Sequence, residues 1–177
     1  MKKKVMLVLV GVFAAFSAGA AQKDYLEEVE SLGFVAGQGL ACEASKYDTF
    51  EMLARAILIS KAKSDQMQEE GMQTYNAAKA ESFILKIRDG FSNCASIAES
   101  FDRQRIFKSV LYGDGTIQMP DGKLIKPRQI YDSTLVYKKD PNLREKMIKL
   151  YEEGYEKIHK DPNYQKALRE RQSQDNL

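Results

Sequence analysis

The side chains of this chain that could most readily take part in a reaction are its two cysteines. They are Cys42 in GLACEASKYD and Cys94 in FSNCAS. A single thiol can act as a nucleophile or redox centre, and two thiols can form a disulfide. Reactive cysteines usually belong to a CxxC pair or lie beside histidine or basic residues that stabilise the thiolate. Neither cysteine has such a local sequence. Because two cysteines allow only one pairing, we expect a structural disulfide between Cys42 and Cys94. The alternative is that both thiols stay free.

The remaining side chains give little support for catalysis or metal binding. His159 is the only histidine, so a zinc centre built from histidines is not available. Acidic neighbours such as Glu27 and Glu28 point in different directions on a helix and are typical of a solvated surface. Methionines at helical spacing favour core packing over a copper site; these are Met52, Met67 and Met72. We therefore expect no enzyme activity, no cofactor and no metal.

Glycine-rich and aspartate-rich segments are better explained by chain turns than by ligand binding. No strand precedes the cluster Gly33, Gly37 and Gly39, and no Gly-Lys-Ser/Thr follows it, so a phosphate-binding loop is not indicated. We interpret the cluster as a flexible connector after a short helix over residues 24–32. Asp114 and Asp121 lack the repeated acidic spacing of a calcium-binding loop, and turn formation explains them better.

The first twenty residues have the organisation of a secretory signal peptide. Three lysines at positions 2–4 precede an apolar stretch over residues 5–16, and Ala18-Gly19-Ala20 supplies the small residues of a cleavage site. We expect residues 1–20 to be removed, which places the mature protein in the periplasm or outside the cell. The alternative is an uncleaved amino-terminal anchor. No integral membrane segment is expected after cleavage.

Removal of the leader also changes the charge of the chain. The full sequence has 27 Lys and Arg against 25 Asp and Glu, and the leader carries three of the lysines and no acid. The mature chain therefore has 24 basic against 25 acidic residues, a net charge of −1. A nucleic-acid partner is not expected, because binding to phosphates requires a basic face.

The two cysteines are placed by a predicted helical hairpin over about residues 40–102. Apolar residues recur at helical spacing before and after SDQMQEEG, the polar stretch over residues 64–71. In an antiparallel helix pair that turns near residue 68, Cys42 and Cys94 lie opposite each other. Asp65 could cap the second helix, with Gln68 completing a capping box. A single uninterrupted helix is the alternative, because the turn contains no proline.

The rest of the chain adds smaller elements to this hairpin. A β-ribbon is predicted over about residues 112–128, with Pro120-Asp121-Gly122 at its turn. Amphipathic helices are predicted over about residues 141–172, each started by an Asp-Pro-Asn sequence, and residues 173–177 are expected to be a disordered tail. The predicted fold is mainly α: a single domain over residues 21–172, built on a disulfide-stapled antiparallel helical hairpin with a small β-hairpin and C-terminal amphipathic helices.

Long amphipathic helices in a chain with few catalytic residues favour a binding role. We expect an envelope protein as partner, in an assembly or adaptor function within an envelope complex such as a secretion or conjugation system. The alternatives are a periplasmic chaperone-like client binder and a small-ligand carrier. The chaperone is disfavoured because the LTxxQ motif of known helical periplasmic chaperones is absent. A pocket lined by Tyr47, Phe83 and Ile87 would favour the carrier. The sequence nominates no partner-binding residues and no oligomeric state.

Overall fold

The computed structural model describes residues 13–160 together with residues 162 and 166. The structure is mainly helical with a small antiparallel sheet. It divides into two compact units, residues 1–138 and residues 139–177, where the sequence predicts one domain over residues 21–172. The division falls in the polar sequence Lys138-Lys139-Asp140-Pro141.

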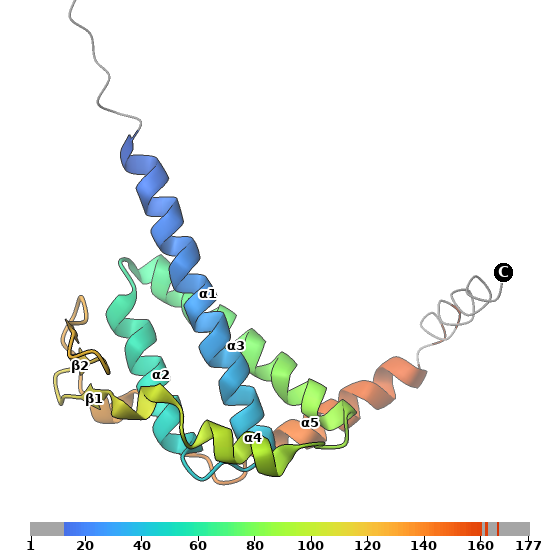
Figure 1. The fold of residues 1–177 in the computed structure, drawn as a ribbon. Coiled ribbons are helices and arrows are strands. Elements are labelled where there is room, and N and C mark those ends of the chain that lie inside the picture. Colours follow the sequence, from blue (N-terminus) through green and yellow to red (C-terminus); the bar gives the residue numbers. More distant parts are fainter. Residues whose placement is uncertain (1–12, 161, 163–165, 167–177) are drawn as a thin grey trace, which may run out of the picture. The chain divides into compact units, whose positions relative to one another are not determined.

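The first unit contains four α-helices, two 3₁₀ turns and three short strands within its described residues (Figure 1). In chain order these are α1 (Phe13–Ala41), α2 (Tyr47–Lys61), α3 (Asp65–Arg88), α4 (Cys94–Phe101), η1 (Arg105–Lys108), β1 (Val110–Leu111), β2 (Ile117–Gln118), β3 (Leu124–Ile125) and η2 (Ser133–Leu135). The second unit contains α5 (Leu143–Lys160). Most of the expected signal peptide, the second C-terminal helix and the tail lie outside the described residues.

The main helix pair of the first unit is α1 and α3, which run in the same direction. The side chain of Gln22 donates a hydrogen bond to Glu70, and Gly37, later in α1, lies against Lys79, later in α3. A Cβ atom at Gly33 would lie 2.3 Å from the Tyr75 carbonyl oxygen, and one at Gly37 would lie 2.2 Å from that of Lys79. The two glycines therefore allow the helix backbones to approach more closely than any side chain would permit.

The interpretation of this glycine cluster as a flexible connector is wrong. Gly33, Gly37 and Gly39 all lie within α1, which continues to Ala41 instead of ending at residue 32. Glycine costs about 1 kcal/mol relative to alanine inside a helix. At Gly33 and Gly37 the close packing against α3 offsets that cost, and Gly39 lies under the ring of Phe101.

The predicted turn between helices is present, but the pairing differs from the predicted hairpin. Residues 62–64 join α2 to α3, and Ser64 is the N-cap, its side chain accepting a hydrogen bond from the Met67 amide. The sequence predicts Asp65 as the cap, one residue later. Helix α2 runs back along α1, and α3 then packs mainly on α1 instead of on α2.

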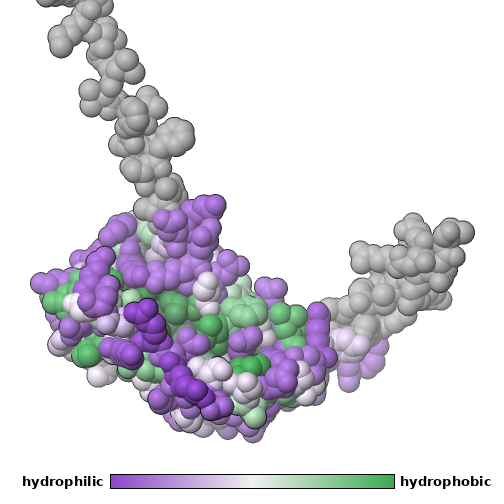
Figure 2. Space-filling view, viewed as in Figure 1, coloured by the Kyte–Doolittle hydropathy of each residue, from purple (hydrophilic) through white to green (hydrophobic). Residues whose placement is uncertain are grey.

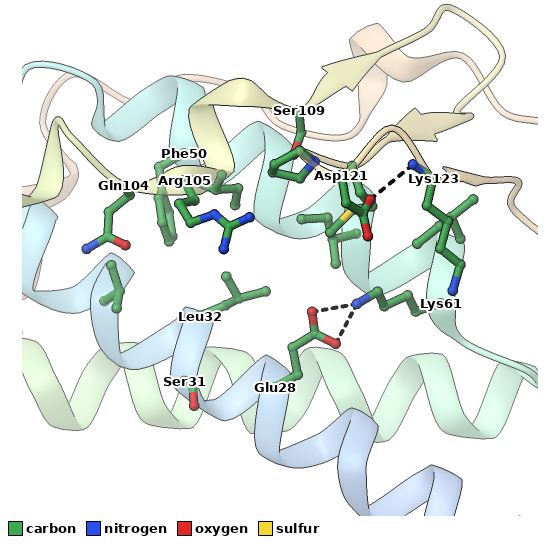
Figure 3. Close-up of a pocket in the computed structure, with 16 residues that line it drawn as sticks. Glu28, Ser31, Leu32, Phe50, Lys61, Gln104, Arg105, Ser109, Asp121 and Lys123 are labelled. Carbon is green, nitrogen blue, oxygen red and sulfur yellow. Dashed lines mark hydrogen bonds and ion pairs between the residues drawn. The ribbon is translucent and has the colours of Figure 1, made fainter.

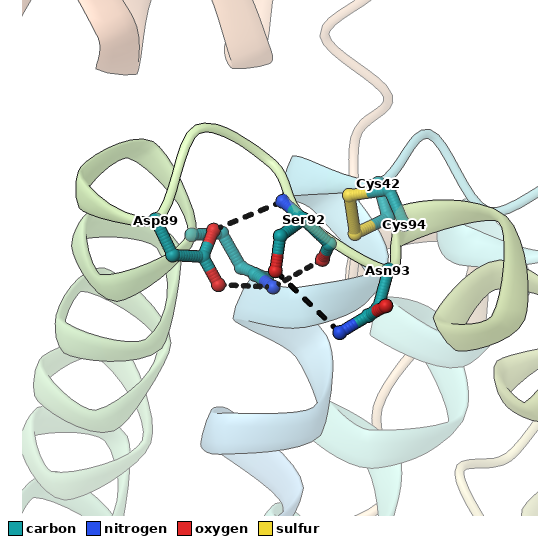
Figure 4. Close-up of a disulfide and its surroundings, with 6 residues drawn as sticks. Cys42, Asp89, Ser92, Asn93 and Cys94 are labelled. Atoms are coloured by element: carbon teal, nitrogen blue, oxygen red, sulfur yellow. Dashed lines mark hydrogen bonds and ion pairs between the residues drawn. A yellow bond between two sulfur atoms is a disulfide. The ribbon is translucent and has the colours of Figure 1, made fainter.

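The disulfide between Cys42 and Cys94 is confirmed, with the two Cα atoms 4.8 Å apart. Cys42 directly follows the end of α1, and Cys94 is the first residue of α4. The predicted second helix is interrupted because Gly90 takes a left-handed conformation that ends α3, with the Phe91 amide bound to the Lys86 carbonyl. The disulfide therefore joins the end of α1 to the start of α4. Figure 4 shows it beside the loop over residues 89–93.

The predicted β-hairpin is confirmed, and a third strand extends it. Gln118 pairs with Leu124 across a turn in which Gly122 has a φ of +85°. Strand β1, which the sequence does not predict, pairs with β2 on its other side. The inner face of this sheet packs on α2, where Ile117 is buried against Leu53 and Ile57. Such short strands are marginal alone, so the helix supports the sheet.

We predict that Gly33→Ala and Gly37→Ala each destabilise the first unit by about 1–3 kcal/mol, because the added methyl group meets backbone atoms of α3 that cannot move aside. Urea denaturation followed by circular dichroism measures the change. Gly113→Ala is the control, since a Cβ atom there has nothing within 4 Å. Unchanged stability in both helix variants would show that α1 and α3 do not approach this closely.

Removal of either cysteine should also destabilise the chain. The disulfide spans a sequence separation of 52 residues, and chain entropy assigns about 4 kcal/mol to a loop of that length as an upper value. We expect Cys42→Ser, Cys94→Ser and the double variant to lose similar amounts in thermal denaturation under oxidising conditions. Additive losses in the double variant would contradict a bridge between the two residues.

Candidate binding site

A buried carboxylate joins two helices of the first unit, α2 and α3. Glu51 in α2 is 0% exposed. Its Oε1 atom accepts hydrogen bonds from the hydroxyls of Tyr47 and Tyr75, at 3.0 Å each, and from Lys79 Nζ at 2.8 Å. Its Oε2 atom accepts from Arg55 Nε at 2.8 Å. The cluster thus contains one acid, two cations and two tyrosines, drawn from α2 and α3.

The electrostatics of this cluster favour the ionised glutamate. Burial alone raises the pKa of Glu51, but Lys79 and Arg55 outweigh it and hold that pKa below its usual value of 4.5. Burial and the Glu51 carboxylate both raise the pKa of Tyr75 well above 10. The tyrosines therefore stay protonated and act as donors. Glu51 has no exposed surface, and the hydrogen bonds of its two carboxylate oxygens connect α2 to α3.

The sequence contains a signal for this cluster, although the cluster is not among the sites predicted from the sequence. Tyr47, Glu51 and Arg55 are spaced by four residues on α2, as are Tyr75 and Lys79 on α3. Side chains four residues apart lie on one face of a helix. A glutamate with a tyrosine and an arginine on the same face, next to a second tyrosine–lysine pair, indicates a shared polar contact between two helices.

The segment over residues 126–138 is held to the start of α3 near one end and to α2 at the other. Arg128 forms an ion pair with Asp65 at the start of α3. At the other end, the Tyr137 hydroxyl donates to Asp48 at 2.9 Å, and the guanidinium group of Arg55 lies 5.7 Å from the centre of the Tyr137 ring. The buried cluster therefore also contributes to the position of this segment.

A cavity of about 560 Å³ lies between α1, α2, η1 and the sheet. Figure 3 shows its walls, with Leu32 and Glu28 from α1 facing Arg105 and Ser109 on the opposite side. Most of the wall is apolar. The apolar side chains are Leu32, Val35, Phe50, Ile57, Ile106, Met119, Pro120 and Ile125.

The charged groups of the cavity are unevenly paired. Both carboxylate oxygens of Glu28 lie 2.6 Å from Lys61 Nζ. Asp121 accepts a hydrogen bond from the backbone amide of Lys123 at 3.0 Å. Figure 3 shows these residues on one side of the cavity and Arg105 on the other. No acidic side chain in the described part of the chain forms an ion pair with Arg105.

A second cavity of about 750 Å³ adjoins the first and shares Glu28, Lys61, Lys123 and Ile125 with it. It lies between β3, the start of α3 and the early part of α1. Its walls carry more charge, including Lys63, Lys126 and Asp24. The Glu28–Lys61 ion pair lies at the boundary between the two cavities.

The outer face of the sheet is unusually apolar for an exposed surface. The register places Val110, Gln118 and Leu124 side by side on the face opposite Ile117, and the Tyr112 hydroxyl donates to Gln118. Val110 is 48% exposed and Tyr112 is 44% exposed. Ile130 and Leu135, on the segment over residues 126–138, are about four-fifths exposed. On the face drawn in Figure 2, hydrophobic residues form a broken band between hydrophilic ones.

Among the candidate residues named from the sequence, Cys42 and Cys94 form the expected disulfide. The other candidates do not come together in a binding site. Tyr47 and Phe83 are core residues, and neither they nor Ile87 line the two cavities. A pocket lined by these three residues, which would favour a small-ligand carrier, is therefore not among the described cavities. Within the described residues no group of three or more His, Cys, Asp or Glu side chains is arranged to hold a metal ion. The side chain of His159 lies outside the described part.

We predict that Glu51→Gln destabilises the chain by about 3–5 kcal/mol, because it leaves the buried Lys79 and the partly buried Arg55 without a carboxylate. Chemical denaturation at pH 7 measures the loss. The control is Glu99→Gln, which removes an ion pair with Arg103 whose side chains are 69–70% exposed. Exposed pairs contribute about 0–1 kcal/mol. Similar losses in the two variants would show that Glu51 is not buried in an ionised cluster.

We also predict how the stability difference between the wild-type chain and Glu51→Gln depends on pH. A carboxylate with a lowered pKa stabilises the folded chain fully above its unfolded pKa and loses that contribution as the pH falls through the folded pKa. The difference in unfolding free energy between the wild-type chain and Glu51→Gln should therefore be constant above about pH 5.5 and shrink below 4.5, the usual pKa of the group. A difference that grows towards acid pH would reverse the sign of the pKa shift.

Comparisons with protein-family models, with curated proteins and with solved structures found no match to this chain. Among the described residues, no helix is long and apolar enough to cross a membrane.

Proposed function

We propose that this chain is an exported, non-enzymatic binding protein that docks onto another envelope protein through the outer face of its sheet. The observation that carries the proposal is the distribution of exposed apolar side chains. Nine large apolar side chains are exposed in the described part of the chain, and five lie within residues 110–135. These are Val110, Tyr112, Leu124, Ile130 and Leu135. Clusters of exposed apolar side chains are typical of protein interaction sites.

The architecture behind this surface is suited to docking. The inner face of the sheet rests on α2 through Ile117, which is fully buried. The neighbouring segment over residues 126–138 is anchored at Asp65 and Asp48. Surfaces held in place before binding lose less entropy when a partner docks. The surface is therefore presented by a fixed support, although its strands are only two residues long.

The envelope location rests on two features of the chain. The amino-terminal sequence has the organisation of a signal peptide, and the cysteines form a disulfide. Disulfides form and persist in oxidising compartments such as the periplasm. We therefore propose a periplasmic or secreted protein that acts as an assembly or adaptor component of an envelope complex, for example a secretion or conjugation system.

A chaperone-like client binder is less well supported by the geometry. Such a protein would present a continuous apolar surface along its helices. Phe34 on α1 and Leu85 on α3 are the exposed large apolar side chains on the described helices of the first unit. A small-ligand carrier is the second candidate, because the cavity between α1, α2 and the sheet has a mostly apolar wall.

We predict that a photo-reactive amino acid placed at Val110 or Tyr112 cross-links the oxidised protein, in cells of the source organism, to one common partner. The same amino acid at Leu85 is the matched control, because Leu85 is 45% exposed but lies on α3. Mass spectrometry of the cross-linked species identifies the partner. Val110→Glu should abolish co-purification of that partner while the far-ultraviolet circular dichroism spectrum stays unchanged.

Three results would count against the proposal. Equal cross-linking at Leu85 would show that the sheet is not a preferred surface. A broad set of unrelated products at all positions would favour the chaperone-like binder. Recovery of the protein alone from every position would leave the outer face without a partner and favour the carrier.

A further inference from the structure

We propose that the cavity between α1, α2, η1 and the sheet binds a small amphiphilic acid, a molecule with one carboxylate group and an apolar body. This inference does not depend on the docking of a partner protein, because Val110 and Tyr112 of the outer sheet face do not line the cavity. Three features of the cavity support it: its size, the pairing of its charges and one unsatisfied hydroxyl group.

The cavity has the size and surface of a small-molecule site. Its volume of about 560 Å³ lies within the range of about 300–1,000 Å³ that is typical of ligand pockets. Leu32 and Ile57 come from two different helices, and Ile106 and Ile125 come from η1 and β3. An apolar ligand body would contact all four elements, and burial of its surface would supply most of the binding free energy.

The charged side chains that line the cavity favour a ligand with one negative charge. On one side of the cavity, Glu28 is paired with Lys61, and Asp121 is bound to a backbone amide. Lys123 lies on this side as well, opposite Arg105 (Figure 3). This side therefore carries two acids and two cations, which balance in charge although Lys123 forms no ion pair in the described part of the chain. The other side carries the guanidinium group of Arg105 with no acid beside it among the described residues.

Arg105 is suited to recognise a carboxylate. A guanidinium group presents two parallel N–H donors that match the two oxygens of a carboxylate, and such bidentate pairs are among the stronger hydrogen bonds in proteins. Figure 3 shows the side chain of Arg105 extending from η1 into the space above Leu32. A carboxylate at this position would leave the ligand's apolar body over Leu32 and Ile57, directed towards the Glu28–Lys61 pair.

Ser109 is a second and independent sign of a ligand. It lines the same cavity and is only 9% exposed, yet its hydroxyl oxygen has no hydrogen-bond partner in the described part of the chain. A buried polar group without a partner is costly, and most such groups in native proteins are satisfied. The hydroxyl oxygen itself is shielded in this structure, so its donation to a ligand carboxylate requires rotation about the Cα–Cβ bond.

A ligand with charges at both ends fits the cavity less well. At the side away from Arg105, the cation and acid closest together are already joined at 2.6 Å. A zwitterion or a dianion would have to separate this pair, whereas an apolar end can lie against the neighbouring Ile57 and Ile125. The cavity therefore favours a monoanion with an apolar end.

Isothermal titration calorimetry with decanoate tests the proposal on the oxidised mature chain. We expect saturable binding at one site per chain, with clearly weaker binding of 1-decanol and of decyltrimethylammonium. Arg105→Gln should weaken decanoate binding about tenfold or more, the usual effect of losing a hydrogen bond to a charged group. Binding of 1-decanol should not change in that variant. Arg103→Gln is the matched control, since Arg103 is an exposed arginine like Arg105 but pairs with Glu99 and does not line the cavity.

The location of the ligand is tested separately by NMR. Decanoate should shift the backbone amide resonances of Leu32, Ile106 and Ile125 more than those of Val110 and Leu85. The proposal is overturned by equal binding of decanoate and 1-decanol, by equal losses in Arg105→Gln and Arg103→Gln, or by the absence of binding to protein with a native circular dichroism spectrum. None of these outcomes bears on cross-linking at Val110, so the two proposals fail separately.

Discussion

The buried carboxylate of Glu51 is the interaction on which the arrangement of the first unit depends. Helix α2 carries the sheet on one side and the segment over residues 126–138 on another, but its direct packing against α3 is limited. Glu51 joins α2 to α3 through Tyr75 and Lys79, and its partner Arg55 reaches the ring of Tyr137. A buried ion cluster of this kind adds little net stability over apolar packing, but it is costly to disrupt because each remaining charge stays buried. It therefore fixes which helix faces meet.

The close contact between α1 and α3 has a consequence for the rest of the fold. Since α2 runs back along α1 before α3 begins, α1 and α3 can lie parallel, and Gly33 and Gly37 bring their backbones together. The disulfide then ties the end of α1 to the start of α4, which keeps Phe101 against Gly39 and its ring 4.8 Å from that of Phe50. Residues that follow α4 are in this way directed over α2, where η1 and the sheet form one wall of the cavity.

Local features of this fold could be predicted from the sequence, whereas the packing of distant segments could not. The Pro120-Asp121-Gly122 turn favours a hairpin by its own chemistry, and a single pair of cysteines permits one disulfide. The structure confirms both predictions.

The prediction for Gly33 and Gly37 is wrong because glycine is favoured both in loops and in close helix contacts, and only the position of α3 distinguishes the two cases. The four-residue spacing around Glu51 marks a polar helix face, but one sequence does not tell whether the charges on that face are buried, so the cluster is not predicted. Arg105 and Ser109 are brought opposite Leu32 by the path of the whole chain, so no local motif marks the cavity.

The sheet connects the cavity to the proposed docking surface through the alternation of side chains along a strand. Ser109 lines the cavity, and the next residue, Val110, lies on the outer face. In the same way Ile125 lines the cavity while Leu124 is exposed beside Gln118. Successive residues of a strand point to opposite faces, so neighbouring positions can serve two different surfaces. Because β3 is only two residues long, a single peptide unit carries one residue of each surface. A ligand held against Ile125 and a partner held against Leu124 would therefore act on the same short strand, which makes this sheet the part of the molecule where the two activities would influence each other.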